Sequence, residues 1–288
     1  MIDVPSFLQK IRSWKRIVLL APSFPVDFSY PQIIIDLKKI WFSKIVELTY
    51  AAKLINIHYH ELFQNNPKIT QICSNCPTIV QYIKNKYPQY KKNLTSIASP
   101  MIIMSRVIKK EFWSETKTIF IGPCFAKKIE AQQTKEVDDV ITFKELQEII
   151  SYVQKNNLSL LIDTKTEKID FDSFYNDYTK IYPLTGAVAQ TMHYKDILQT
   201  EQVIIDDGIK NIDKAIKAME AKPDTNFLDL LACSGGCIGG PWIISKESTA
   251  IKTQKIIAYK DHMKHNQNNP HLGQFAYAEG LEIKNTFI

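Results

Sequence analysis

The sequence predicts an α/β fold of two lobes, with largely parallel or mixed sheets flanked by helices and a functional site at the lobe interface. Short apolar runs alternate with segments of helical spacing along the 288 residues, which is typical of strands joined by crossover helices. Hydrophobic residues make up 45% of the chain, enough for a sizeable core. Two of the apolar runs lead directly into cysteines.

Each strand is predicted from a short run of apolar residues bounded by turn-forming ones. The first run, RIVLLAPS, ends at a loop rich in proline, and the last, FLDLLA, leads directly into Cys233. The predicted strands are 16–23, 44–50, 118–122, 137–141, 158–162, 203–205 and 227–232.

The helices are predicted from 3.6-residue spacing and from their start signals. Pro77 stands where a helix begins, and Thr142 with Glu145 forms a capping box, in which each residue's side chain bonds the other's backbone. The predicted helices are 33–42, 78–86, 143–153 and 211–220. We assign 1–244 to one two-lobed domain and 245–288 to a polar, basic C-terminal extension. Both 163–180 and the extension are expected to be peripheral or mobile.

The net charge of +6 fits either a lysine-rich solvated surface or attraction to an acidic partner. The basic residues are scattered, with a mild concentration over 246–264, so we expect no nucleic acid, which requires a clustered stripe. The apolar runs are too short to insert in a membrane. Residues 1–14 do not resemble a signal peptide, which predicts a cytoplasmic protein.

Five cysteines in such a chain point to metal binding, catalysis or inert burial rather than disulfides. Cys124 and Cys233 each follow a predicted strand, at the end where α/β sheets place ligands. Cys76 precedes the helix that begins at Pro77, where free N–H groups stabilise a thiolate. Cys237 lies in a glycine-rich loop. We therefore predict that these four cysteines hold an iron–sulfur cluster.

The glycine-rich loop is CSGGCIGG, residues 233–240. Glycine lets the backbone approach a bulky ligand and adopt positive φ. We expect three of its glycines and one proline beside a cysteine to contact the cofactor: Gly235, Gly236, Gly239 and Pro123.

Two other interpretations of the cysteines remain. Buried free cysteines are common in protein cores, and four thiolates also suit a tetrahedral zinc site. Zinc ribbons, however, are short local hairpins, whereas these cysteines are spread across most of the chain. A cluster between two lobes fits that spread better.

At the cysteine sites the sequence resembles the H-cluster domain of the iron-only (FeFe) hydrogenases. That family carries TSCCPxW, MPCxxKxxE and MACxGGCxxGG in this order. The counterparts are ICSNCP at 72–77, GPCFAKKIE at 122–130 and LACSGGCIGG at 231–240. The second and third match closely and the first is altered. Ala21-Pro22 and Ser99-Pro100 are further points of similarity, and the resemblance spans about 15–242.

The resemblance implies a 4Fe–4S cubane bridged by a cysteine to a diiron unit. Cys76, Cys124, Cys233 and Cys237 would bind the cubane, and Cys237 would bridge to the diiron unit. Lys127 would donate to a ligand of that unit.

Asn75, Glu130 and Ser99 would occupy catalytic positions, with Glu130 on a proton route. Independently of the family, Lys127 would need an anionic partner if buried; otherwise it is a surface residue beside Lys128.

The departures from the family bear on catalysis. Active members have a proton-transferring cysteine where this chain has Asn75, and an amide has no proton to release near neutral pH. Gly122 and Leu231 replace the methionines that open the second and third motifs. Pro241 and Trp242 replace a glycine and a polar residue.

A few other polar side chains have ordinary explanations. Glu61 is interpreted as an exposed helix carboxylate, although a proton route could use it. His262 and His265 are interpreted as part of a solvated face rather than half of a metal site. Whether Cys73 reaches the position of the missing thiol is an open question.

Three functions follow. The first is reversible reduction of protons to H2, slowed by Asn75. The alternative is a non-catalytic hydrogen or redox sensor, or a cluster-bearing subunit of a hydrogenase complex. The third is a cubane-only protein similar to iron–sulfur assembly factors, which Lys127 and Cys237 disfavour. No CxxCxxC run occurs, so electrons are expected from an acidic ferredoxin or another redox subunit, and a sensor would also have a signalling partner.

Overall fold

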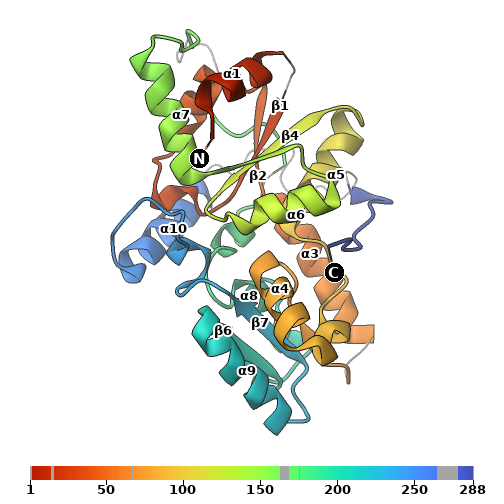
Figure 1. Cartoon of the computed structure of the whole chain (residues 1–288). Helices are drawn as coiled ribbons and strands as arrows, with labels where there is room; N and C mark the ends of the chain where they lie inside the picture. The colour runs from red at the N-terminus through yellow and green to blue at the C-terminus, as the bar shows by residue number, and fades with distance from the viewer. Residues whose placement is uncertain are drawn as a thin grey trace.

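The protein has two lobes, each built on a parallel sheet, as the computed structural model shows (Figure 1). The structure describes residues 2–13, 16–65, 68–162, 169–174, 176–264 and 278–287. The α/β class and the two lobes predicted from the sequence are confirmed.

The larger lobe contains a four-stranded sheet in the order β2-β1-β4-β5, with every pair parallel. Its central strands are buried along nearly their full length, as expected for a parallel sheet covered on both faces. The bounds are β1 Arg16–Leu20, β2 Lys44–Glu47, β4 Lys117–Gly122 and β5 Asp139–Thr142.

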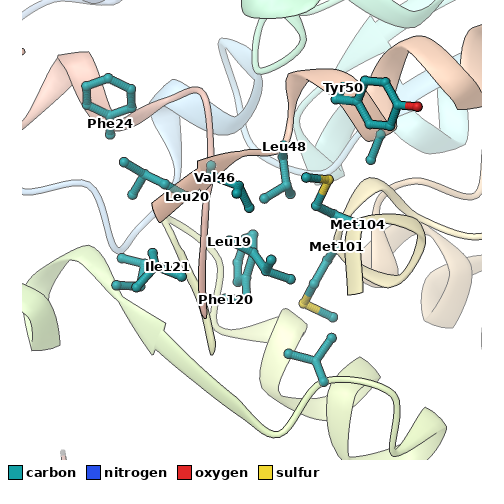
Figure 2. Close-up of a cluster of buried hydrophobic side chains, with 14 of the residues drawn as sticks. Leu19, Leu20, Phe24, Val46, Leu48, Tyr50, Met101, Met104, Phe120 and Ile121 are labelled. Carbon is teal, nitrogen blue, oxygen red and sulfur yellow. The ribbon is translucent and has the colours of Figure 1, made fainter. Parts of the chain in front are cut away.

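Helices cover this sheet on both sides. α5 packs on β1 and β4, while α7 packs on β4 and β5 and is itself covered by α1. Figure 2 shows Met101 and Met104 of α5 beside Leu19, Val46 and Leu48. The helices of this lobe are α1 Val4–Arg12, α2 Gln32–Lys39, α5 Pro100–Phe112, α6 Ala126–Thr134 and α7 Phe143–Lys155.

The smaller lobe contains a three-stranded parallel sheet in the order β3-β7-β6, which α9 covers. Its core is separate from that of the larger lobe. The long helix α3, Thr49–Asn65, runs from the end of β2 toward this lobe (Figure 1). The other elements are β3 Gln71–Ile72, α4 Pro77–Lys86, α8 Ala187–Thr191, β6 Val203–Asp207, α9 Ile209–Ala221 and β7 Phe227–Leu231.

Most sequence-predicted elements are present with shifted ends, but the strand predicted over 158–162 is wrong. This segment follows a turn at the end of α7, where Asn157 has a φ of 52°. The Leu160 N–H bonds the Lys39 carbonyl at the end of α2, and Leu161 is fully exposed. A strand requires a neighbouring strand to pair with, and none lies beside this segment in the described chain.

The segments expected to be peripheral include buried parts. Helix α10, Thr249–Lys264, lies within the predicted extension, and its Ile256 and Tyr259 belong to the main core. Lys180 is fully buried. Near the chain end, Phe287 is buried and Lys284 forms a β-bridge with Ile97. The expected peripheral character is therefore wrong for these residues, whereas the domain boundary at 244 stays a prediction.

No described helix is long and apolar enough to span a membrane.

Candidate metal centre

The four cysteines reach the lobe interface from four different elements. Cys124 follows β4 and Cys233 follows β7, both at the carboxyl ends of parallel strands. Cys76 is the N-cap residue of α4. Cys237 lies in the short 3₁₀ helix η6, Gly236–Gly239.

The four thiols lie close enough together for each to influence the pKa of its neighbours. Burial, followed by the negative charges of Cys76 and Cys124, raises the pKa of Cys233 to about 12. The pKa of Cys237 is raised well above its usual value by burial and then by all three other sulfurs. Four mutually repelling thiolates are stable in such a place when a cationic centre binds them.

Backbone N–H groups already bond the Cys124 sulfur. Burial raises the pKa of this thiol, while hydrogen bonds from the backbone of Lys127 and Ala126 act in the opposite direction. These donors belong to the first turn of α6, where helical N–H groups have no partner within the helix. These donors would stabilise a negative charge on the Cys124 sulfur, although burial still keeps the pKa of the thiol above its usual value.

A cavity of about 100 Å³ adjoins three of the cysteines. Its wall is mainly apolar, with Ala21 and Pro22 after β1 and Met101 of α5 among the lining residues. Of the predicted site residues, it is lined by Asn75, Cys76, Pro123, Cys124, Lys127 and Cys237. Such a wall would hold a compact, weakly hydrated group.

Cys233 is not among the described residues that line this cavity, but its sulfur lies close to Gly240. A Cβ added to Gly240 would be 3.6 Å from the Cys233 Sγ and 3.2 Å from the Pro123 carbonyl oxygen. The contact with the carbonyl oxygen is tight, so a larger residue at Gly240 would press on Pro123, whereas the distance to the Cys233 sulfur is an ordinary van der Waals contact.

Lys127 is buried at the cavity wall and has an anionic partner within the chain. Its Nζ donates to Glu130 Oε2 at 2.6 Å and to the Asn75 carbonyl at 3.3 Å. The expectation that a buried Lys127 needs an anion is confirmed, and Glu130 meets it. Glu130 does not line the cavity, and its Oε1 has no partner among the described residues.

Asn75 faces the cavity and bonds across the lobe interface. Its Nδ2 donates to the Tyr182 hydroxyl at 2.9 Å, while its buried Oδ1 has no partner in the described part of the chain. Burial raises the pKa of Tyr182 well above its usual value. Neither side chain therefore releases a proton near neutral pH.

Two groups that the sequence did not single out also line the cavity, Ser23 and Asp229. Both are buried, and each has one side-chain oxygen without a partner among the described residues, as has the nearby Ser99 Oγ. Asp229 Oδ2 accepts from the Ala189 N–H at 3.0 Å. Asp229 lies within the apolar run FLDLL. A charged residue inside an otherwise apolar strand was the only feature of the sequence that could have marked Asp229 as a site residue.

The glycines of the loop pack against the protein itself. Gly236 has a φ of 79°, and a Cβ there would lie 2.5 Å from the Pro183 carbonyl oxygen. A Cβ at Gly239 would lie 1.8 Å from the Ser234 carbonyl oxygen, and one at Gly235 would be 2.7 Å from Thr249 Cγ2. These contacts explain why the three positions are occupied by glycine. The expectation that these glycines contact a cofactor stays a prediction.

Cys73 belongs to a different environment. It is fully buried, and its Sγ accepts a 3.3 Å hydrogen bond from the Tyr59 hydroxyl. The cavity is lined by Asn75 and not by Cys73, as far as the described residues go. Cys73 therefore does not take the place of the missing thiol.

The remaining polar candidates lie elsewhere. Glu61 is exposed on α3 and contacts His58. His262 borders a separate pocket beside Tyr30, and His265 lies outside the described residues. No group of three or more His, Cys, Asp or Glu in the described chain is arranged around a single metal ion.

The family comparison agrees with this geometry. The family model described as "Iron only hydrogenase large subunit, C-terminal domain" matches residues 15–241. The chain belongs to this family. The iron-only hydrogenase fold also covers it almost completely: the apo [FeFe]-hydrogenase HydA1 of Chlamydomonas reinhardtii superposes with a TM-score of 0.66 over 99% of both chains, at 14% identity.

Sequence relatives within and around the iron-only hydrogenases fall into two kinds. Iron hydrogenase 1 of Clostridium pasteurianum is 25% identical, over 82% of this chain and 49% of that protein. The cytosolic Fe–S cluster assembly factor NAR1 of Kluyveromyces lactis is 22% identical, over 64% of this chain and 54% of that protein. The chain thus spans about half the length of these relatives.

Proposed function

We propose that the chain holds one 4Fe–4S cluster through Cys76, Cys124, Cys233 and Cys237, and that it works as a non-catalytic or weakly catalytic redox protein. The observation that carries this is geometric: Cys76, Cys124 and Cys237 line one cavity, and the Cys233 sulfur lies beside Gly240, which also approaches the Pro123 carbonyl. A cubane takes one cysteine per iron, so the sulfurs need not meet at one point as zinc ligands do.

The polar groups of the cavity support the non-catalytic part of the proposal. Fast hydrogen chemistry needs a group that exchanges protons near neutral pH beside the reacting centre. The Asn75 amide donates a hydrogen bond to the Tyr182 hydroxyl, and neither group exchanges protons readily near neutral pH. Several relatives are named cluster assembly factors rather than hydrogenases, so membership of the family does not imply hydrogen turnover.

A diiron unit bridged through Cys237 is the second candidate, because the apolar cavity adjoins Cys237 and contains Lys127. Lys127 would orient such a unit by donating a hydrogen bond, but its Nζ is already paired with Glu130. We place the chain's role in the cytosol, as a hydrogen or redox sensor or a cluster-bearing subunit. Its electron partner would be an acidic ferredoxin or another redox subunit.

Anaerobic reconstitution with iron and sulfide tests the cluster. We expect about four irons and four sulfides per chain, and loss of most of both in Cys124→Ala. Cys73→Ala is the matched control, since Cys73 is buried outside the cavity, and it should keep its iron. Bound zinc without sulfide, or equal losses in the two variants, would overturn the proposal.

Infrared spectroscopy tests the diiron unit after maturation with a diiron precursor. Bands of metal-bound CO and cyanide would establish loading, and their absence from a protein that holds its cubane would exclude it. Hydrogen evolution with reduced viologen then separates an enzyme from a sensor. Turnover comparable to that of an active hydrogenase would contradict the non-catalytic proposal.

A further inference from the structure

Two aromatic rings that are far apart in the sequence stack on the surface beside the cysteines. The rings of Phe125 and Trp242 have centroids 5.5 Å apart and an interplanar angle of 20°. Phe125 directly follows Cys124 and is 45% exposed, a large fraction for such a residue. Trp242 is half-buried and lies two residues after Gly240, which approaches Cys233.

Two lysines flank the stacked rings. The Lys128 Nζ lies 5.5 Å from the centroid of the Phe125 ring, and the Lys144 Nζ lies 5.6 Å from that of the Trp242 ring. Lys128 also pairs with Glu145, which is almost fully buried. The exposed part of this surface thus carries positive charge around an apolar centre.

The rings are held firmly in place. The Lys144 Nζ donates to the Pro241 carbonyl at 2.7 Å. The Asp27 carboxylate accepts from the N–H groups of Ile244 and Ser245, each at 2.9 Å. Phe125 is the N-cap residue of α6. A surface fixed in this way loses little conformational entropy when a partner binds.

We propose that Phe125, Trp242, Lys128 and Lys144 form the surface on which an acidic one-electron carrier protein docks to exchange electrons with the cluster. This inference rests on the proposed function, because it requires a cluster behind the rings. One electron passes from the reduced carrier to the oxidised cluster, so the carrier is oxidised, the cluster is reduced and no bond forms or breaks.

The charge and the residue composition of this surface favour an acidic electron carrier as the partner. Aromatic residues are enriched at the centres of protein interfaces, and tryptophan is among the residues that most often contribute a large share of the binding energy. The flanking ammonium groups and the net charge of +6 attract an acidic surface and speed encounter at low salt. Complexes of electron carriers bury small interface areas. A surface made of one aromatic pair and two lysines is small enough to match such an interface.

The test follows reduction of the reconstituted cluster by a reduced, acidic plant-type ferredoxin in stopped flow. Trp242→Ala and Lys144→Glu should each slow the reaction at least about tenfold at low salt. The wild-type rate should fall as salt rises. Dithionite needs no docking surface, so its reaction should be the same in every variant.

Two matched controls keep the test specific. Trp113→Ala removes another exposed tryptophan, at the end of α5. Lys260→Glu reverses a lysine that also lies over an aromatic ring, that of Tyr178. Both controls should reduce at the wild-type rate.

The outcomes separate the two proposals. Wild-type rates in both Trp242→Ala and Lys144→Glu would overturn the docking surface and leave the cluster proposal intact. A dimer that Trp242→Ala dissociates would also overturn it, since the surface would then bind a second copy. Failure of the wild-type chain to load any cluster would overturn both.

Discussion

The side-chain amide of Asn75 donates a 2.9 Å hydrogen bond to the hydroxyl of Tyr182. This bond joins the segment before α4 to the segment before α8, and both residues line the cavity beside the cysteines. At this point the cavity wall therefore presents two groups that hold their protons near neutral pH.

Asn75→Cys is expected to raise hydrogen evolution in protein matured with a diiron precursor. A thiol beside the cavity can release and accept protons, and positioned acid–base groups contribute about a hundredfold or more to rate. Asn75→Ser, which replaces the amide with a hydroxyl close in size to the thiol but without useful acidity, is the control and should give no gain. Infrared bands establish equal loading first. Equal rates in wild type and Asn75→Cys would show that the missing thiol does not limit turnover.

The buried pair of Lys127 and Glu130 is expected to be a sensitive point for stability. Glu130→Gln leaves the Lys127 charge buried without its partner, and breaking a buried pair in this way costs about 3 kcal/mol or more. The measurement is urea unfolding of the metal-free chain. Glu247→Gln is the control, because its pair with Lys255 is exposed. A loss no larger than that of the control would contradict a structural role for the pair.

The sequence predicted the strands that position the cysteines because each is a short apolar run. β4 and β7 were identified in this way, as was β1 beside β4, and their buried patterns explain why. Helix α3 was not predicted, because it is buried on several sides and its apolar residues show little one-sided periodicity. Short β3 consists of two residues and has no signal of its own.

The sequence indicated which cysteines would lie at the site, but it did not indicate the residues around them. Motif spacing identified Cys124, Cys233 and Cys237, whereas Tyr182 and Lys180 came from stretches without a recognisable pattern. Asp229 was hidden among apolar neighbours. The stacking of Phe125 on Trp242 joins residues more than a hundred positions apart, so it depends on how the whole chain folds.

Tyr259→Phe is expected to loosen α10. The Tyr259 hydroxyl donates to Glu47 Oε1 at 2.9 Å, while the fully buried Lys180 Nζ donates to Glu47 Oε2 at 2.5 Å. Removing the hydroxyl leaves a buried carboxylate oxygen without its donor, which costs about 1–3 kcal/mol. Hydrogen exchange over 249–262 should become faster. Tyr178→Phe, which removes an exposed hydroxyl, is the control, and equal protection in both variants would contradict the anchoring role.

Asp229 is expected to make stability depend on pH in the acidic range. Burial raises its pKa from 3.8 to about 6 in the folded protein. Between these values the folded state keeps a proton that the unfolded state releases, so stability is greatest below the unfolded pKa and falls as pH rises to about 6. The loss is about 3 kcal/mol for this pKa difference. Above this window the contribution of Asp229 is constant.

Asp229→Asn isolates this effect, because asparagine keeps an acceptor for the Ala189 N–H and does not titrate. Urea unfolding of the metal-free chain at pH 4 and pH 7 gives the measurement. Relative to wild type, the variant should gain stability at pH 7 and gain none at pH 4, because other titrating groups are common to both proteins. A difference between the two proteins that stays the same at both pH values would show that the Asp229 carboxyl does not titrate in this window.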